Sequence, residues 1–309
     1  MAVQTDVVII ARRIKELRLL PLLSEPTRPV PATAEVVLLC LIETDPPPCL
    51  GAMLEHHRRS LVRHALLVVS SDVVLDDAIA REPTVSVVRY DAGRLQRRGA
   101  RPLDALNASA RRWLRDRWCL VVAPNEFFVH PFWPKRRVPE LVAFLEMERR
   151  RHLQAVTVDL IEGEGVEPGG GILQPGQGFD RAGYVQSFWE RQGMALVQGG
   201  PWLRGPFRHD PARAPVLNRT ALFRWRRNLF LRRARADAFA GGILAVWPYR
   251  MMNTMHAVEH VSPVGALLRR FGHTVLAGTA PFAPGLTTVP LDDVSALERA
   301  GLMTRGQWF

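Results

Sequence analysis

Residues 36–69 read VVLLCLIETDPPPCLGAMLEHHRRSLVRHALLVV, and this stretch decides the fold that we expect. It opens with seven consecutive apolar residues, Val36–Ile42, which is typical of a strand buried on both faces. After three prolines, residues 49–62 space their apolar side chains as a helix does, and residues 65–69 form a second apolar run. A strand, a helix and a strand in this order predict two parallel strands joined by a helix.

The same alternation continues toward residue 154. The further elements that we expect are a helix at 72–81, a strand at 84–89, a helix at 102–117, a strand at 120–123 and a helix at 139–154. This order predicts an α/β fold with a Rossmann-like, mostly parallel, doubly wound sheet and helices on both of its faces.

The division of the chain follows from the same pattern. We expect an N-terminal extension over residues 1–33, one α/β domain over 34–280 and a C-terminal tail over 281–309 with a small helix near 294–300. Residues 163–178 contain seven glycines and two prolines, too many for a regular element. We interpret them as a mobile loop that borders the functional site.

The composition is that of an ordinary globular protein, with 309 residues of which 47% are hydrophobic. No apolar run approaches the roughly 20 residues that span a bilayer, and the first residues do not resemble a signal peptide, so we expect a cytoplasmic protein. Cys40, Cys49 and Cys119 show no metal-ligand spacing, so three isolated thiols are expected.

The formal charge of +11 comes almost entirely from arginine, since Lys15 and Lys135 are the only lysines. A GC-rich coding sequence gives such a bias without any anionic partner. Residues 204–235 are different, because they hold ten arginines and one acidic residue, Asp210. They predict either a local site for anions or a solvated basic face.

Polar residues follow the predicted strands at the edge where open parallel sheets bind ligands. The candidates for donor binding are Glu43, Ser70, Asp72, Asn125 and Glu126. The chain has no G-x-x-x-x-G-K loop, no G-x-G-x-x-G after the first strand, no G-x-S-x-G elbow and no H-E-x-x-H pair. Their absence disfavours nucleotide triphosphatase, nicotinamide, serine hydrolase and zinc protease functions.

Several motifs together resemble the family 2-like glycosyltransferases of the GT-A fold. They are MLEHHRRSLVRHALLVVSSD at 53–72, WCLVVAPNEFFVHP at 118–131, FDRAGY at 179–184, QGGPWLRGPF at 198–207, PVLNRTALFRWRR at 215–227 and SPVGALLRRFG at 262–272. The resemblance covers about residues 34–275 in order. It implies transfer of a sugar from a nucleotide-sugar donor to a glycan or cell-surface acceptor.

The departures from the family concern its polar residues. The family's Asp-x-Asp holds a divalent cation on the donor diphosphate, whereas this chain has Ala123 and Asn125 at those positions. Asn125 and Glu126 are the two possible ligands that remain there, and they could coordinate Mg²⁺ or Mn²⁺ only if two protein ligands are enough to hold the ion. Ser70 replaces the family's strand-two aspartate, and Arg269 replaces a late histidine.

Each candidate also has a purely structural interpretation. Glu126 is either a residual ligand, and the one candidate catalytic residue, or a carboxylate that caps a turn. The structural interpretation of Asp72 is an N-cap of the helix predicted to start there. His57 falls on the apolar face of its helix, where a packed histidine is expected. Arg204 and Arg208 could clamp a diphosphate or an anionic acceptor, because a guanidinium group matches phosphate oxygens.

Three functions therefore remain open at this stage. The first is a glycosyltransferase, metal-independent if arginines neutralise the leaving diphosphate. The second is an inactive relative that binds a glycan, a nucleotide or a protein partner on the same scaffold. The third is a protein that binds anions or a membrane surface through residues 204–235; nucleic acid is a weaker alternative, because no nucleic-acid module matches this order of elements.

Overall fold

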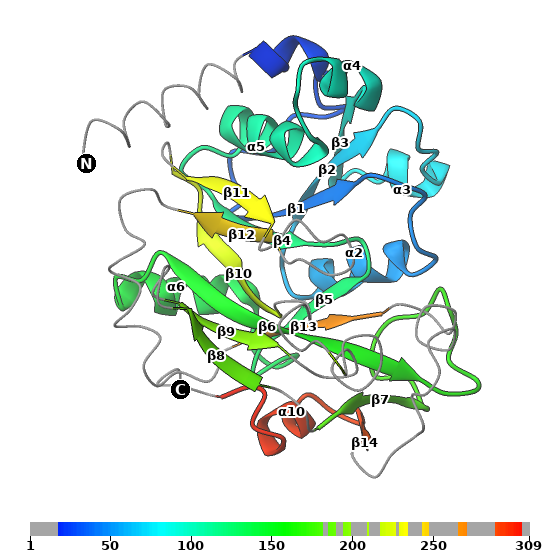
Figure 1. Ribbon diagram of the computed structural model, residues 1–309, viewed down its shortest axis with the longest axis vertical. Coiled ribbons are helices and arrows are strands. Elements are labelled where there is room, and N and C mark those ends of the chain that lie inside the picture. Colours follow the sequence, from blue (N-terminus) through cyan, green and yellow to red (C-terminus); the bar gives the residue numbers. More distant parts are fainter. Residues whose placement is uncertain are drawn as a thin grey trace.

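The structure is a computed structural model that describes residues 18–181, 185–189, 194–198, 209, 217–226, 229–233, 243–246, 265–270 and 288–304. Most of the described strands form one mixed sheet in the order β14-β7-β6-β10-β4-β1-β2-β3, with β13 attached to β6 and β5 attached to β13 (Figure 1). The protein therefore has the mixed α/β class that the sequence predicts. No helix among the described residues is long and apolar enough to cross a membrane.

One half of the sheet is parallel. Its strands are β1 (Val36–Ile42), β2 (His64–Ser70), β3 (Val85–Tyr90) and β4 (Trp118–Val122). β1 lies between β2 and β4 and runs parallel to both, and β3 runs parallel to β2. Every residue of β1 is buried, as expected for a strand covered on both faces.

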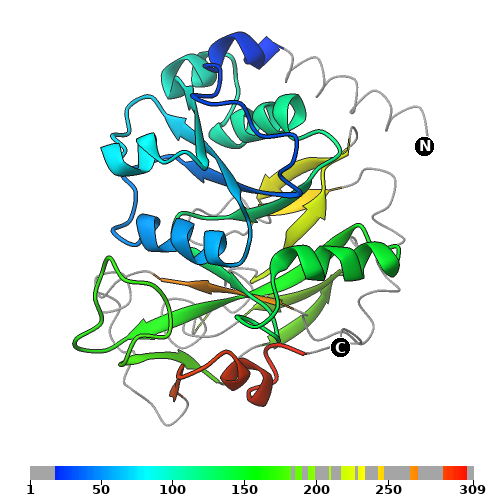
Figure 2. The ribbon, with the colours of Figure 1, turned by 180° about the vertical axis from the view of Figure 1, so that it is seen from behind.

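Alternate residues of β1 belong to two different cores, one on each face of the sheet. Leu38 and Cys40 pack with α2 and α6, whereas Leu39 and Leu41 pack with α4 and α5. The helices of this region are α2 (Leu50–Arg59), α3 (Asp77–Arg81), α4 (Ala92–Arg97), α5 (Pro102–Trp113) and α6 (Val138–Met147). α2 and α6 lie on the face turned toward the viewer in Figure 2, so the sheet is doubly wound as predicted.

The other half of the sheet is largely antiparallel. Its strands are β5 (Glu126–Val129), β6 (His152–Glu162), β7 (Gln177–Asp180), β10 (Asn218–Arg224), β13 (Gly265–Arg269) and β14 (Thr288–Pro290). β10 lies between β4 and β6 and is antiparallel to both, whereas β13 is parallel to β6 and antiparallel to β5. The prediction of a mostly parallel sheet is therefore correct only for the half that contains β1.

The remaining elements are short. They are η1 (Leu20–Leu22), the pairs β8 (Val185–Trp189) with β9 (Met194–Gln198) and β11 (Phe230–Arg233) with β12 (Ile243–Val246), and α10 (Ser295–Arg299). α10 confirms the helix predicted in the C-terminal tail. Residues 23–27 run along β3, where the Thr27 N–H donates to the Val87 carbonyl at 3.0 Å, and they cover the backbone groups of that edge.

The predicted helices are longer than the observed ones: α2 ends at Arg59 and not at residue 62, α5 ends at Trp113 and not at residue 117, and two others differ more. The helix expected at 72–81 begins only at Asp77, because Asp76 and not Asp72 is its N-cap and accepts a 2.7 Å hydrogen bond from the Ala78 N–H. The helix expected to reach residue 154 ends at Met147. Arg149 there has a left-handed φ of 55°, which ends the helix and leaves the chain free to enter β6.

Candidate functional site

One edge of the sheet, which we call the carboxyl edge, carries the ends of β1, β2, β4, β6 and β13. β1, β2 and β4 are parallel, so their last residues lie at the same edge. β6 is antiparallel to β10, which is antiparallel to β4, so β6 also ends there, and so does β13 beside it. The arrowheads of β1 and β6 both point to the right-hand side of Figure 1, where residues 163–176 also lie.

The strand order reverses between β1 and β4. From β1 the chain continues to β2 and β3 on one side, and it then returns to place β4 on the other side of β1. In open α/β sheets such a reversal leaves a crevice outside the strand ends, because the connecting chains leave toward opposite sides. The fold thus indicates a ligand-binding position beyond the ends of β1 and β4.

Three of the candidates flank this position. Glu43 follows β1 directly and is exposed, and the pairing of Ile42 with Val69 brings it to the level of Ser70 on β2. Asp72 is exposed on the loop after β2. The carboxylates of Glu43 and Asp72 are therefore open to solvent at the carboxyl edge, whereas Ser70 is buried and its carbonyl accepts a 3.0 Å hydrogen bond from Arg89.

Glu126 is the first residue of β5 and is only 1% exposed. Its Oε2 accepts a 2.7 Å hydrogen bond from the Ala123 N–H, and its own N–H donates to the Ala123 carbonyl at 3.1 Å. The carboxylate thus caps the turn between β4 and β5. This contact matches the structural interpretation of Glu126 that the sequence left open.

Asn125 is engaged in the same turn. Its Nδ2 donates to the carbonyl of Arg270, and its own carbonyl accepts a 3.1 Å hydrogen bond from the Arg270 N–H. Among the described residues, no group of three or more His, Cys, Asp and Glu side chains could hold a metal ion. Asn125 and Glu126 together therefore do not fit the divalent cation that the resemblance implies.

Two arginines at the end of β13 fill the space beside this turn. Arg269 lies opposite both Glu126 and Asp159 in the sheet, and its Nε donates to Asp159 Oδ1 at 2.6 Å within the protein interior. Arg270 is 3% exposed, and its Nε pairs with the carboxylate of Glu162 at the end of β6. Each buried carboxylate of β6 at this edge is thus neutralised by a neighbouring guanidinium, as burial of charge requires.

Arg270 also holds the glycine-rich loop. Its guanidinium donates to the carbonyls of Gly170 and Gly171 and, at 2.9 Å, to that of Glu167. A Cβ on Gly169 would lie 3.7 Å from the Pro48 carbonyl, which shows how close the loop comes to the segment after β1. Residues 163–176 therefore border the carboxyl edge as predicted; Gln177 and Gly178, which the sequence assigned to the loop, belong to β7.

Cys49 lies in this neighbourhood, buried at the start of α2. Burial raises the pKa of its thiol, and the charge of the nearby Arg270 opposes that rise only in part. The three cysteines are all buried and free, as the sequence predicts. A thiol with a raised pKa is a poor nucleophile near neutral pH, so this environment does not favour Cys49 as a catalytic group.

The histidines of α2 are structural. His57 is 1% exposed, its Nδ1 lies 2.8 Å from the Met53 carbonyl, and its Nε2 accepts a 3.2 Å hydrogen bond from the Phe128 N–H. One ring nitrogen must donate and the other must accept, so the ring is neutral. His56 lies 2.8 Å from the Phe128 carbonyl through Nε2 and stacks on Trp133. The expectation of a packed His57 is confirmed.

Arg204 and Arg208 lie outside the described residues, as does half of the stretch 204–235. Their role as a diphosphate clamp stays a prediction, like donor binding by Glu43 and Asp72.

The sequence did not single out Arg270, Asp159 and Glu162. The available signal was a pair of adjacent arginines after an apolar run, together with two carboxylates three residues apart. Each arginine pairs with a carboxylate more than a hundred residues away in the sequence, so the pairing itself could not be predicted.

The comparisons with known proteins are sparse. No family model and no curated protein matches the chain. A solved structure to which it is similar is described as a glucose-1-phosphate thymidylyltransferase from Bacillus anthracis in complex with a sucrose, at 8% identity. The match covers 88% of this chain and 97% of that one with a TM-score of 0.29, a level of similarity that supports no conclusion about fold or activity.

Proposed function

We propose that this protein binds a nucleotide-sugar at the carboxyl edge and transfers its sugar to a glycan acceptor without a divalent cation. The observation that carries the proposal is the reversal of strand order between β1 and β4, with the exposed carboxylates of Glu43 and Asp72 beside it. The motifs shared with family 2-like glycosyltransferases support the same class of ligand. Transfer breaks the bond between the sugar C1 and the diphosphate, whose oxygen keeps the electron pair. A new bond forms from C1 to the oxygen of an acceptor hydroxyl, whose proton passes to water.

Different side chains of the protein would bind the nucleoside of the donor and its diphosphate leaving group. Exposed carboxylates such as Glu43 and Asp72 suit hydrogen bonds to the hydroxyls and the base N–H groups of a nucleoside. Arg204 and Arg208 suit the diphosphate, because guanidinium groups neutralise the charge that develops as it leaves. A metal is not required in this scheme, which agrees with the poor fit of Asn125 and Glu126 to a cation.

The experiment is a binding titration of UDP-, GDP-, CMP- and dTDP-sugars, each with manganese and with EDTA. A donor at about 100 times its dissociation constant would stabilise the protein by about 2.7 kcal/mol, a shift that thermal unfolding detects. We expect one donor to bind equally well in EDTA. Glu43→Gln and Asp72→Asn should weaken that binding, whereas Glu148→Gln, an exposed carboxylate beyond the end of α6, is the matched control.

A donor that binds only with manganese would overturn the metal-independent mechanism, and the absence of binding by every donor would overturn the function itself.

A second function has its own support, because Asn125 and Glu126 are both engaged in internal hydrogen bonds. An inactive relative that retains donor binding would explain this. Donor binding in EDTA without release of nucleoside diphosphate in the presence of acceptor glycans would favour that alternative.

A further inference from the structure

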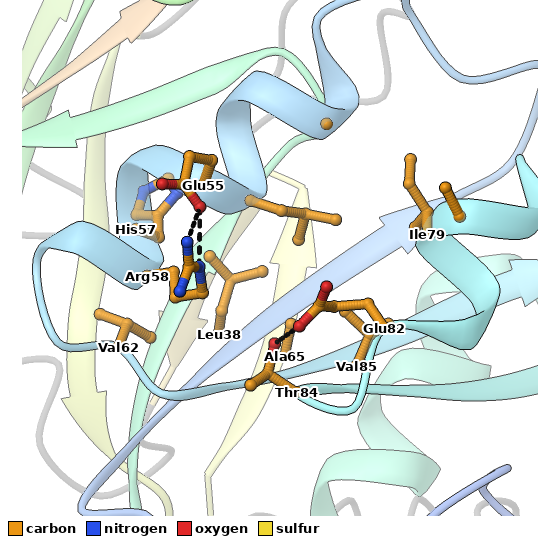
Figure 3. A pocket seen from close by; sticks show the side chains of 13 residues that line it. Leu38, Glu55, His57, Arg58, Val62, Ala65, Ile79, Glu82, Thr84 and Val85 are labelled. Carbon is orange, nitrogen blue, oxygen red and sulfur yellow. Dashed lines mark hydrogen bonds and ion pairs between the residues drawn. The ribbon is translucent and has the colours of Figure 1, made fainter.

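We propose that a cavity between α2 and α3 is a second ligand site, which takes a small molecule with a ring-sized apolar body and an ammonium group. The cavity has a volume of about 210 Å³ and lies over the first residues of β1, β2 and β3 (Figure 3). It lies toward the edge of the sheet opposite to the carboxyl edge. It therefore lies away from the position proposed for the nucleotide-sugar.

The floor of the cavity is a single row of side chains across three parallel strands. Leu38 of β1 is paired with Ala65 of β2, which is paired with Val85 of β3. All three belong to the core on the α2 side of the sheet. The small side chain of Ala65 stands between two larger ones, so the middle of the row is lower than its ends. The hollow is thus a consequence of the sequence of the strands.

The helices do not fill this hollow. α2 contributes Leu54 and His57 to the walls, and α3 contributes Ile79, but both helices turn their smallest residues, Gly51 and Ala78, toward the cavity. A Cβ on Gly51 would meet no atom within 4 Å, and the φ of this residue is not in the left-handed region. Glycine is therefore not required there by the backbone or by packing, although it weakens a helix relative to alanine.

The size and lining of the cavity define the apolar part of the ligand. An engineered cavity of roughly 150 Å³ lined by aliphatic side chains is known to accept benzene. The volume here is larger, at about 210 Å³, and the floor and walls are aliphatic apart from the neutral ring of His57. One six-membered ring with a short substituent would fit this space and leave its polar end at the mouth.

The mouth of the cavity is polar, and its charges differ in how they are neutralised. Glu55 and Arg58 form an ion pair of 2.5 Å, so neither requires a charged ligand. Glu82 accepts a 3.0 Å hydrogen bond from the Thr84 hydroxyl, and no ion pair to it exists among the described residues. The available carboxylate at the rim therefore favours a ligand with a positive charge, although the protein as a whole carries +11.

The test uses 2-phenylethylamine as the probe, with 2-phenylethanol and phenylacetate as its neutral and negative counterparts. Each is titrated into the full-length protein by saturation-transfer NMR, and methyl spectra report on Leu54, Val62 and Ile79. We expect the amine to bind with a dissociation constant of about 1 mM or tighter. It should bind about two- to fivefold more tightly than the alcohol, and phenylacetate should bind least.

Variants separate this site from non-specific binding. Ala78→Phe and Gly51→Leu place side chains in open positions of the lining and should abolish binding, whereas Ala143→Phe, at an exposed alanine of α6, should not. Glu82→Gln should remove the preference for the amine and leave binding of the alcohol intact. Absence of saturable binding, equal binding by phenylacetate, or unchanged binding in both blocking variants would overturn the proposal. Because nucleotide-sugar binding is measured separately, failure here leaves the proposed function standing.

Discussion

Acid should destabilise the protein well above the pH at which carboxylates titrate, because its buried histidines are neutral. The side chains of His56 and His130 are 7% and 0% exposed, and burial lowers their pKa values to about 4 and about 3. In the unfolded chain both pKa values return to about 6.5. Between these limits the unfolded state binds more protons than the folded state, so stability falls as the pH falls.

The size of the effect follows from the same values. Between pH 7 and pH 5 each histidine gains a proton in the unfolded chain and almost none in the fold, a loss of about 2 kcal/mol per histidine. His56 and His130 together would remove about 4 kcal/mol from a total that is typically 5–15 kcal/mol. His57, held neutral by its two hydrogen bonds, acts in the same direction, because burial lowers its pKa as well.

Urea unfolding at pH 7, 6 and 5 and constant ionic strength measures this loss directly. His130→Leu should reduce the loss between pH 7 and pH 5 by about 2 kcal/mol, since one titrating group is removed. Comparing pH values within each variant cancels any change that the substitution makes at pH 7. A free energy of unfolding that is equal at pH 7 and pH 5 would refute the reasoning.

Three further substitutions test other parts of the structure. Arg270→Gln leaves the buried carboxylate of Glu162 unpaired, so the free energy of unfolding should fall by about 3–5 kcal/mol. The same substitution releases the carbonyls of residues 163–176, so limited proteolysis should cut that loop sooner. Asn107→Ala removes the 2.7 Å and 3.0 Å hydrogen bonds between its amide and the backbone of Leu231, and denaturant titration should show a loss of about 2–4 kcal/mol. Asp76→Ala removes the N-cap of α3 and should cost about 1 kcal/mol in the same measurement.

The parallel half of the fold could be predicted because its signals are local. Val36–Ile42 is a strand with the bounds expected from its apolar run, since a strand buried on both faces tolerates no polar interruption. The end of α6 could not be predicted, because residues 148–152 are polar but include no glycine or proline, so they suit the exposed face of a helix as well as a loop. The helix ends because Arg149 adopts a left-handed φ, and an arginine in the sequence does not predict that conformation.

The candidate site was predictable in position but only partly in composition. Residues that follow parallel strands must share one edge, so Glu43 and Asp72 could be placed there from the sequence. The partners of Asp159 and Glu162 could not, because they depend on how β13 enters the sheet beside β6. Pairings between distant strands are set by the whole fold and leave no periodic trace in either segment.

The pairing at β13 also bears on the metal-independent mechanism that we propose. Glu126, Asp159 and the side chain of Glu162 are buried at the end of the sheet, where uncompensated negative charge would cost several kcal/mol. Two solutions exist for such a cluster, a bound divalent cation or permanent positive side chains. Arg269 and Arg270 provide the second for Asp159 and Glu162, because each guanidinium group engages one of these carboxylates directly. A donor that binds beside this edge must therefore find its positive charge elsewhere in the chain, and manganese should neither strengthen its binding nor alter the stability of the free protein.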